Sequence, residues 1–195
     1  MTSALDTAAR HDLYLLVARL LREEVDAALY HRLIATQRDE LRWIEPEIAE
    51  LPEQLAVEVL ATEYCRLFIG PDPVCPPFAS AVRGEALLGG RARTDMAELL
   101  RSLDLTIDPR ARIASSDHVA VVFAVLSELS DPGAIRACLH RFVSPWVPTW
   151  LSRLEREAER TLFRTLARVA RALIDEDHAC CPADSQAPIV EDLLP

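Results

Sequence analysis

The sequence predicts an all-α protein that forms one compact domain of about eight to ten helices. Apolar residues recur at helical spacing through most of the 195 residues, and proline, serine or aspartate stands where most of the periodic segments begin. No convincing alternation of apolar and polar residues appears, and no Asn-Gly or Asp-Gly pair signals a hairpin. Half of the residues are hydrophobic, which is enough for one core.

The first helices follow from caps and spacing. Ser3 can cap a helix whose first turn contains Asp6, and a second helix is expected to begin near Val25. Pro52 suits the first turn of a later helix that continues to Phe68, because the missing N–H of proline costs nothing there.

The second half of the chain contains further helix boundaries. The glycine pair Gly89-Gly90 is expected to end any helix before it. The apolar helix near the middle has a clean stripe from Val119 to Leu129. The predicted helix starts are Thr94 or Asp95, Ser116, Asp131-Pro132, Ser144-Pro145 and Glu159.

The last predicted helix, near residues 159–177, has a buried stripe and an opposite row of arginines. We interpret this row as a solvated face with acidic neighbours, and the alternative is an anion site. It consists of Arg160, Arg164, Arg168 and Arg171. Beyond it the periodicity is lost, so we expect a helical domain at 1–178 and a loose tail at 179–195.

One stretch, from Tyr64 to Ser80, organises the rest of the chain. Its second part cannot be helical, because it contains Pro71, Pro73, Pro76 and Pro77. Gly70 is expected to end the preceding helix as a left-handed cap. The result should be a stiff loop that exposes Val74 and Phe78. Such a loop is either a brace over the core or a preformed lip for a peptide.

Charge and composition limit the classes of partner. The formal net charge is −10, and all 21 basic residues are arginine. This charge either serves solubility or attracts a basic partner, and it argues against nucleic-acid binding. No apolar run approaches the roughly 18 residues that a membrane span needs, and the N-terminus lacks a secretory pattern. We therefore expect a cytoplasmic protein without stable membrane insertion.

The sequence offers little that would support catalysis. It contains no phosphate-binding glycine loop, no dinucleotide fingerprint and no Gly-x-Ser-x-Gly motif. Five cysteines without Cys-x-x-Cys spacing predict neither a zinc site nor a disulfide framework, so we expect no metal and no cofactor. Asp117 and His118 start a helix, but neighbouring helical residues point about 100° apart and form no ready-made dyad. Trp146 and Trp150 either pack in the core or form an aromatic shelf.

Three segments, in order, resemble one known family. The first is Tyr64–Pro71 (YCRLFIGP) followed by Pro76–Ser80 (PPFAS), the second is Asp117–Ala120 (DHVA), and the third is Pro145–Pro148 (PWVP) with Leu154-Glu155 behind it. Together they resemble the chaperone family that includes TorD, DmsD and NarJ, over roughly Ala4 to Ile174.

This resemblance implies an all-helical, non-enzymatic cytoplasmic chaperone. Its client would be a molybdopterin-containing apo-oxidoreductase of the DMSO reductase family, bound through the twin-arginine signal peptide or the enzyme body until the cofactor is inserted. Homodimers also occur in the family. The implied peptide- or client-binding residues are Tyr64, Leu67, Phe68, Gly70, Pro71, Pro76, Pro77, Phe78, Ser80, Asp117, His118 and Trp146.

The acidic balance of the chain could supply carboxylates for two guanidinium groups, so we expect an acidic hollow beside the proline loop. Two alternatives stay open. One is a helical adaptor that docks an enzyme subunit without recognising a signal peptide. The other is a small hydrolase that uses Asp117 and His118.

Overall fold

The computed structural model describes residues 6–33, 48, 50–85, 90–111, 113 and 115–180. Every regular element in these ranges is helical, which confirms the all-α prediction. The elements are α1 (Thr7–Arg22), a helix at 27–33, α4 (Glu53–Tyr64), the π-helix η1 (Cys65–Ile69), α5 (Ala79–Val82), α6 (Gly90–Ser102), the 3₁₀-helix η2 (Pro109–Ala111), α7 (Val119–Glu128), α8 (Pro132–Cys138), the π-helix η3 (Leu139–Val143), α9 (Val147–Glu157) and α10 (Thr161–Cys180).

Helix α7 is the centre of the core. Its residues from Val119 to Ser127 are buried, except for the half-buried Ala124. A helix that is apolar on every side is stable only when other elements surround it. Helix α1 packs along α7, and the ring of Tyr14 stacks on that of Phe123 with centroids 6.1 Å apart. The single apolar stripe expected here is thus part of a helix that is covered all round.

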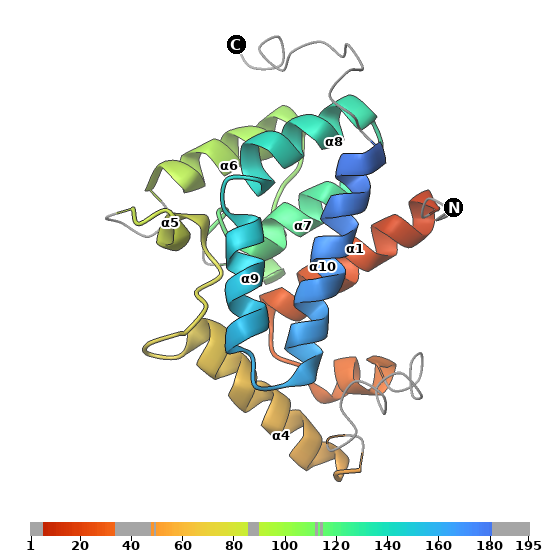
Figure 1. Cartoon of the computed structure of the whole chain (residues 1–195), viewed down its shortest axis with the longest axis vertical. Helices are drawn as coiled ribbons and strands as arrows, with labels where there is room; N and C mark the ends of the chain where they lie inside the picture. Colours follow the sequence, from red (N-terminus) through yellow and green to blue (C-terminus); the bar gives the residue numbers. More distant parts are fainter. Residues whose placement is uncertain are drawn as a thin grey trace.

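The other helices enclose α7 in one compact domain (Figure 1). Helices α9 and α10 pack side by side and are joined by a short turn at residues 158–160. In Figure 1, α6 and α8 lie above them, and α4 lies below. Among the described residues, no helix is long and apolar enough to cross a membrane.

A buried carboxylate fixes the corner between α4 and the turn that joins α9 to α10. Glu63 accepts hydrogen bonds from Nε and Nη2 of Arg66 at 2.7 and 3.0 Å, and from the backbone N–H of Glu159 at 2.6 Å. Arg66 also donates to the carbonyl of Glu157 at 2.7 Å. Burial of a charge is costly unless it is paired in this way, so this corner is well defined.

Some predicted helix boundaries are confirmed. Asp131 caps α8 by accepting a hydrogen bond from the N–H of Ala134 at 2.8 Å. The helix at 27–33 begins close to Val25, where Asp26 accepts from the N–H of Leu29 at 2.7 Å. The cap at Asp131 was itself predicted, whereas the start near Val25 was predicted without identifying Asp26 as its cap.

Other boundaries differ from the prediction. Asp6 is the N-cap residue of α1 instead of a first-turn residue, and Ser3 lies outside the described residues. Helix α6 begins at Gly90 and not at Thr94 or Asp95, because glycine is tolerated at a helix start as well as after a helix end. Helix α10 runs from Thr161 to Cys180. The domain limits at 178 and 179 stay a prediction, since residues 181–195 lie outside the described part.

The two short π-helices η1 and η3, called π-turns below, interrupt the helical pattern, and the sequence predicted neither. The N–H of Gly70 donates to the carbonyl of Cys65 at 2.7 Å, and that of Ser144 donates to Leu139 at 2.8 Å. Both bonds reach back five residues. Gly70 has φ −61° and ψ 174°, so the predicted left-handed cap is wrong. Glycine suits this position for another reason, since a Cβ there would lie 3.0 Å from the Cys65 oxygen.

The first π-turn also shapes the loop that follows it. Its carbonyls at Arg66 and Leu67 accept hydrogen bonds from the N–H groups of Val74 and Cys75, at 3.2 and 2.8 Å. The loop is thereby folded back on the core. Val74 and Phe78 are half-buried, so the prediction that they are exposed is wrong. The loop was interpreted as either a brace over the core or a lip for a peptide, and its packing is that of a brace.

We predict that Gly70→Ala lowers the free energy of unfolding by about 1–2 kcal/mol, because the new methyl group is forced against a backbone oxygen that cannot move freely. Urea unfolding would measure this. Asp72→Ala, at the exposed tip of the same loop, is the matched control and should change stability by less than about 0.5 kcal/mol. Equal stability of the Gly70→Ala protein and the wild type would contradict the steric reason given for glycine.

Candidate functional site

The proline segment, residues 71–77, ends against the start of α7. Phe78 and His118 form an isolated antiparallel pair, held by backbone hydrogen bonds of 3.0 and 2.8 Å between their neighbours. Their rings meet edge to face with centroids 5.1 Å apart. Two segments that are 40 residues apart in sequence are thus joined by backbone as well as by side chains.

The carboxylate of Asp117 stabilises this junction through hydrogen bonds to Ser80. Its Oδ2 accepts hydrogen bonds from the backbone N–H of Ser80 at 3.1 Å and from the Ser80 hydroxyl at 2.6 Å. Asp117 therefore caps the short helix α5 from another part of the chain. The carboxylate is almost fully buried, and its Oδ1 has no hydrogen-bond partner among the described residues. A buried carboxylate oxygen without a donor is costly, so this atom has unused capacity to accept a hydrogen bond.

Asp117 lines a small hollow between α5, α6 and the start of α9. Asp95 of α6 and Arg83, just after α5, also line it, together with the aromatic rings of Phe142 and Trp146. The hollow has a volume of about 10 Å³, which is room for roughly one water molecule. The expected hollow with carboxylates is therefore present, but it is much smaller than a guanidinium group and it includes a cation.

His118 caps α7. Its Nδ1 accepts a hydrogen bond from the backbone N–H of Ala120 at 3.1 Å. The sequence had assigned this cap to Ser116, which is wrong, because the Ser116 hydroxyl donates to the carbonyl of Arg93 at 3.0 Å. Burial lowers the pKa of His118 to about 4, so the imidazole is neutral at neutral pH and Nδ1 can act as an acceptor.

Asp117 and His118 do not form a catalytic pair in this arrangement. The carboxylate is bonded to Ser80, and the Nδ1 atom of the imidazole is occupied by Ala120. In a catalytic arrangement, one residue orients the general base toward the nucleophile. Here neither Asp117 nor His118 orients the other. The geometry therefore gives no support to the hydrolase alternative.

Three predicted site residues lie in the hydrophobic core and do not line the hollow. Tyr64, Leu67 and Phe68 are buried. The Tyr64 hydroxyl donates to the carbonyl of Leu21 at 3.2 Å, and Phe68 stacks on Trp150 with centroids 6.1 Å apart. These side chains support the loop from beneath. Their predicted contact with a peptide stays a prediction that would require this core to open.

The remaining predicted residues lie along the loop and at the hollow. Trp146 lines the hollow and donates from Nε1 to the carbonyl of Phe142 at 2.8 Å. Pro76 accepts a hydrogen bond from Trp150 Nε1 at 3.0 Å. Gly70 and Pro71 lie at the turn into the loop, Pro77 is buried, and Phe78 and Ser80 adjoin Asp117. Both tryptophans are buried, as the packing interpretation predicts.

Arg83, Asp95 and Phe142 also line the hollow, and none of them was among the site residues predicted from the sequence. Arg83 and Asp95 looked like ordinary charged residues beside predicted helices, and Phe142 looked like part of an apolar face. No motif or spacing connects the three. Only the packing of α6 against α5, and the turn that places Phe142 of η3 beside Trp146, bring them together.

We predict that the protein loses stability on acidification through His118. Its pKa in the folded state is about 4 and its ordinary value is 6.5, so the unfolded chain binds the extra proton first. The stabilisation that a neutral His118 provides is complete above about pH 6.5, decreases as the pH falls toward 4, and amounts to about 3 kcal/mol. Urea unfolding between these pH values would measure it.

His118→Asn keeps a capping oxygen and removes the titrating group, so its stability should depend less steeply on pH than that of the wild type. His178→Asn changes an exposed histidine of α10 and should leave the wild-type slope unchanged. Identical pH dependence in the His118→Asn protein would show that His118 is not the group responsible.

Comparison with known proteins identifies the family. The sequence profile of the nitrate reductase delta subunit family matches residues 36–152, more than half of the chain. The crystal structure of a proposed redox enzyme maturation protein from Archaeoglobus fulgidus is similar in fold, with a TM-score of 0.56 and 22% identity, over 85% of this chain and 93% of that one. No curated protein sequence matches this chain. This chain belongs to the nitrate reductase delta subunit family, the TorD- and NarJ-like family of redox-enzyme maturation chaperones.

Proposed function

We propose that this protein is a cytoplasmic chaperone for a molybdenum-cofactor oxidoreductase of the DMSO reductase family. It holds the twin-arginine signal peptide of the apo-enzyme, or the apo-enzyme itself, until the cofactor is inserted. The observation that carries this proposal is the buried carboxylate of Asp117, which has one oxygen bonded to Ser80 and one without a hydrogen-bond donor among the described residues.

The chemistry of the twin-arginine signal peptide, called the leader below, fits this carboxylate. A guanidinium group presents several N–H donors in a plane and pairs well with carboxylate oxygens. A hydrogen bond to a charged group contributes about 1.5–3 kcal/mol, and it would satisfy the Oδ1 atom that lacks a donor. Oδ2 would continue to hold Ser80, so the loop need not lose its anchor when a ligand binds.

Access to Asp117 requires the hollow to widen. At about 10 Å³ it has no room for a guanidinium, and the side chain of Arg83 stands at its edge. Arg83 is exposed and is followed by Gly84, which has a positive φ of 68° and no neighbouring atoms where a Cβ would lie. Binding would displace Arg83 by a small movement of this turn, and the arriving arginine would take over the position of a resident one.

The apolar part of the leader would lie on the loop. Phe78 is half-buried, and Ile69 and Pro71 are exposed at the turn that precedes the proline segment. Burial of about 400 Å² of leader surface contributes about 10 kcal/mol at roughly 25 cal/mol/Å². Ordering a flexible peptide removes several kcal/mol of this, so a dissociation constant near 1 μM is expected, which permits release after maturation.

The second candidate function is that of a helical adaptor that docks one enzyme subunit and does not recognise a signal peptide. The inward packing of the loop and the small volume of the hollow favour it, since neither provides an open groove for a peptide. Whether the protein acts as a homodimer stays a prediction in both cases.

We predict that a synthetic twin-arginine leader peptide of a molybdopterin oxidoreductase from the same organism binds with micromolar affinity in calorimetric titration. Asp117→Asn should weaken this binding about tenfold, because the amide keeps the size of the side chain and an acceptor for Ser80 but removes the charge. A twin-lysine version of the peptide should also bind more weakly, because an ammonium cannot pair bidentately.

Asp104→Asn is the matched control. Asp104 is exposed and has a positive φ of 53°, which asparagine tolerates, so this variant should bind the leader like the wild type. Unchanged leader affinity in the Asp117→Asn protein would remove Asp117 from the site. Absence of any leader binding, together with capture of the apo-enzyme, would favour the adaptor.

A further inference from the structure

The arginines of this acidic chain are concentrated on one pair of helices. Between Arg153 and Arg171 the sequence has six arginines and three glutamates, a formal charge of +3. Because the whole chain carries −10, the remaining residues carry −13. We call this surface the basic face. Its arginines are Arg153, Arg156, Arg160, Arg164, Arg168 and Arg171.

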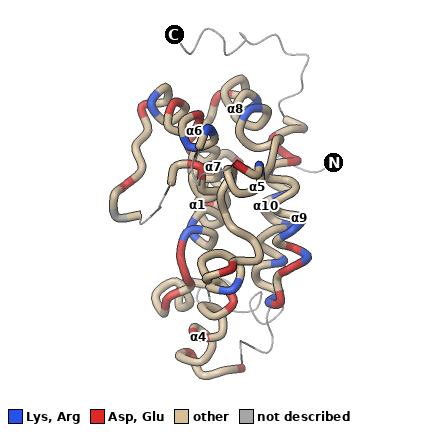
Figure 2. Tube along the Cα trace, turned by 90° about the vertical axis from the view of Figure 1, so that its left-hand side faces the viewer, with Lys and Arg blue, Asp and Glu red and all other residues tan. Residues whose placement is uncertain are grey.

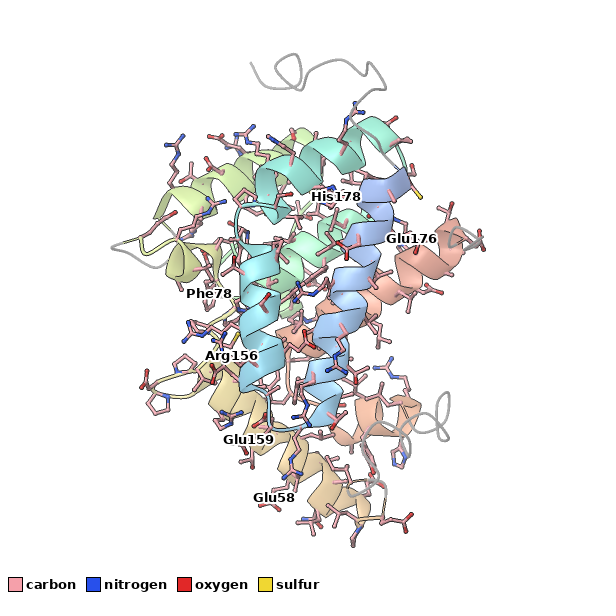
Figure 3. All side chains as sticks on the ribbon, in the orientation of Figure 1. Glu58, Phe78, Arg156, Glu159, Glu176 and His178 are labelled. Atoms are coloured by element: carbon pink, nitrogen blue, oxygen red, sulfur yellow. The ribbon has the colours of Figure 1, made fainter. Side chains whose placement is uncertain are left out.

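Helices α9 and α10 lie side by side (Figure 1), and Arg168 and Arg171 of α10 reach Glu155 of α9, so charged side chains of the two helices meet. The buried positions of α9 are Val147, Trp150, Leu151 and Leu154, so its arginines are directed away from the core. In Figure 2, basic and acidic residues alternate along the outer edge formed by α9. Figure 3 shows Arg156 on the side of α9 away from α10, and Glu159 at the turn that joins the two helices.

The carboxylates of the basic face are already engaged. Glu155 accepts a hydrogen bond from Arg168 Nε at 2.7 Å and lies 3.8 Å from Arg171 Nη2, so two guanidinium groups share one carboxylate. The pairing with Arg168 lowers the pKa of Glu155, which keeps it charged. Glu157 pairs with Arg156 at 3.0 Å. Arg153 and Arg164 contact no carboxylate within the described ranges.

The paired arginines also remain accessible to a partner. The side chains of Arg156 and Arg168 are 68% and 65% exposed in spite of their pairing. Exposed pairs of this kind contribute little to stability, so exchange of partners costs little. The face therefore has more donors than its own carboxylates use.

We propose that the basic face is a second docking surface, for a carboxylate-rich surface on the mature part of the client enzyme. The identity of this partner rests on the proposed function. The leader itself is excluded as the partner, because its arginines would be repelled by Arg153 and its neighbours. The leader and the enzyme body would thus be held by surfaces of opposite sign.

The pattern of charges selects carboxylates over phosphates. Glu155, Glu157 and Glu159 separate the arginines, so a partner must place single negative groups beside the guanidinium groups and away from the glutamates, which a close-set row of phosphates cannot do. The charge of −13 on the rest of the molecule would oppose approach to nucleic acid or to an anionic membrane. A folded protein surface with separate carboxylates can place each one beside an unused guanidinium edge.

The test uses the full chain and a fluorescent peptide of alternating glutamate and alanine as the probe, in fluorescence anisotropy at low salt. The triple variant Arg153→Gln, Arg164→Gln, Arg168→Gln keeps most of each apolar stem and removes three charges. It should bind the probe about tenfold more weakly than the wild type. Wild-type binding should also weaken as salt is added.

The matched control removes three exposed arginines from α6, with Arg91→Gln, Arg93→Gln and Arg101→Gln, and should retain probe binding. The leader-peptide titration is repeated on the face variant and should be unchanged, so a failure of the leader site and a failure of the basic face are separate results. Equal losses in both triple variants, no binding of the probe to the wild type, or tighter binding to a DNA duplex or to phosphatidylglycerol vesicles would each overturn the proposal.

Discussion

The carboxylate of Asp117 is the constraint on which the loop and the hollow both depend. It is buried, it holds Ser80 through one oxygen, and it stands at the point where the proline segment meets α7. A buried charge is stable only where the surrounding donors are fixed, so the junction must be rigid for Asp117 to be tolerated. The same rigidity holds its second oxygen, Oδ1, in a position where no described residue donates a hydrogen bond to it.

The loop is stiff for reasons beyond its prolines. The π-turn at Cys65–Ile69 offers the carbonyls of Arg66 and Leu67 to the returning loop, and Trp150 holds Pro76 from the side of α9. Glu63 then ties the same region to the turn between α9 and α10. The surface of the loop and the basic face are therefore mounted on one connected framework, although they carry opposite chemical preferences.

Much of the fold could be predicted from the sequence, and the site only in part. Helical periodicity identified the all-α class, and Asp131 marked its helix start because its side chain supplies the cap. Periodicity cannot reveal that α7 is buried on all sides, since burial depends on neighbours that are distant in sequence. The π-turns were missed because one extra residue per turn leaves no compositional signal. The hollow draws on Arg83, Asp95 and Phe142, which only tertiary packing brings together.

The π-turn also makes chain length critical. Removing one residue from Cys65–Ile69 would replace the wide turn with ordinary α-helical winding and change the direction in which its carbonyls point. Val74 and Cys75 would then miss the carbonyls that now receive them, and Phe78 would no longer meet His118. In homologous proteins, this stretch should accordingly accept substitutions far more readily than deletions or insertions.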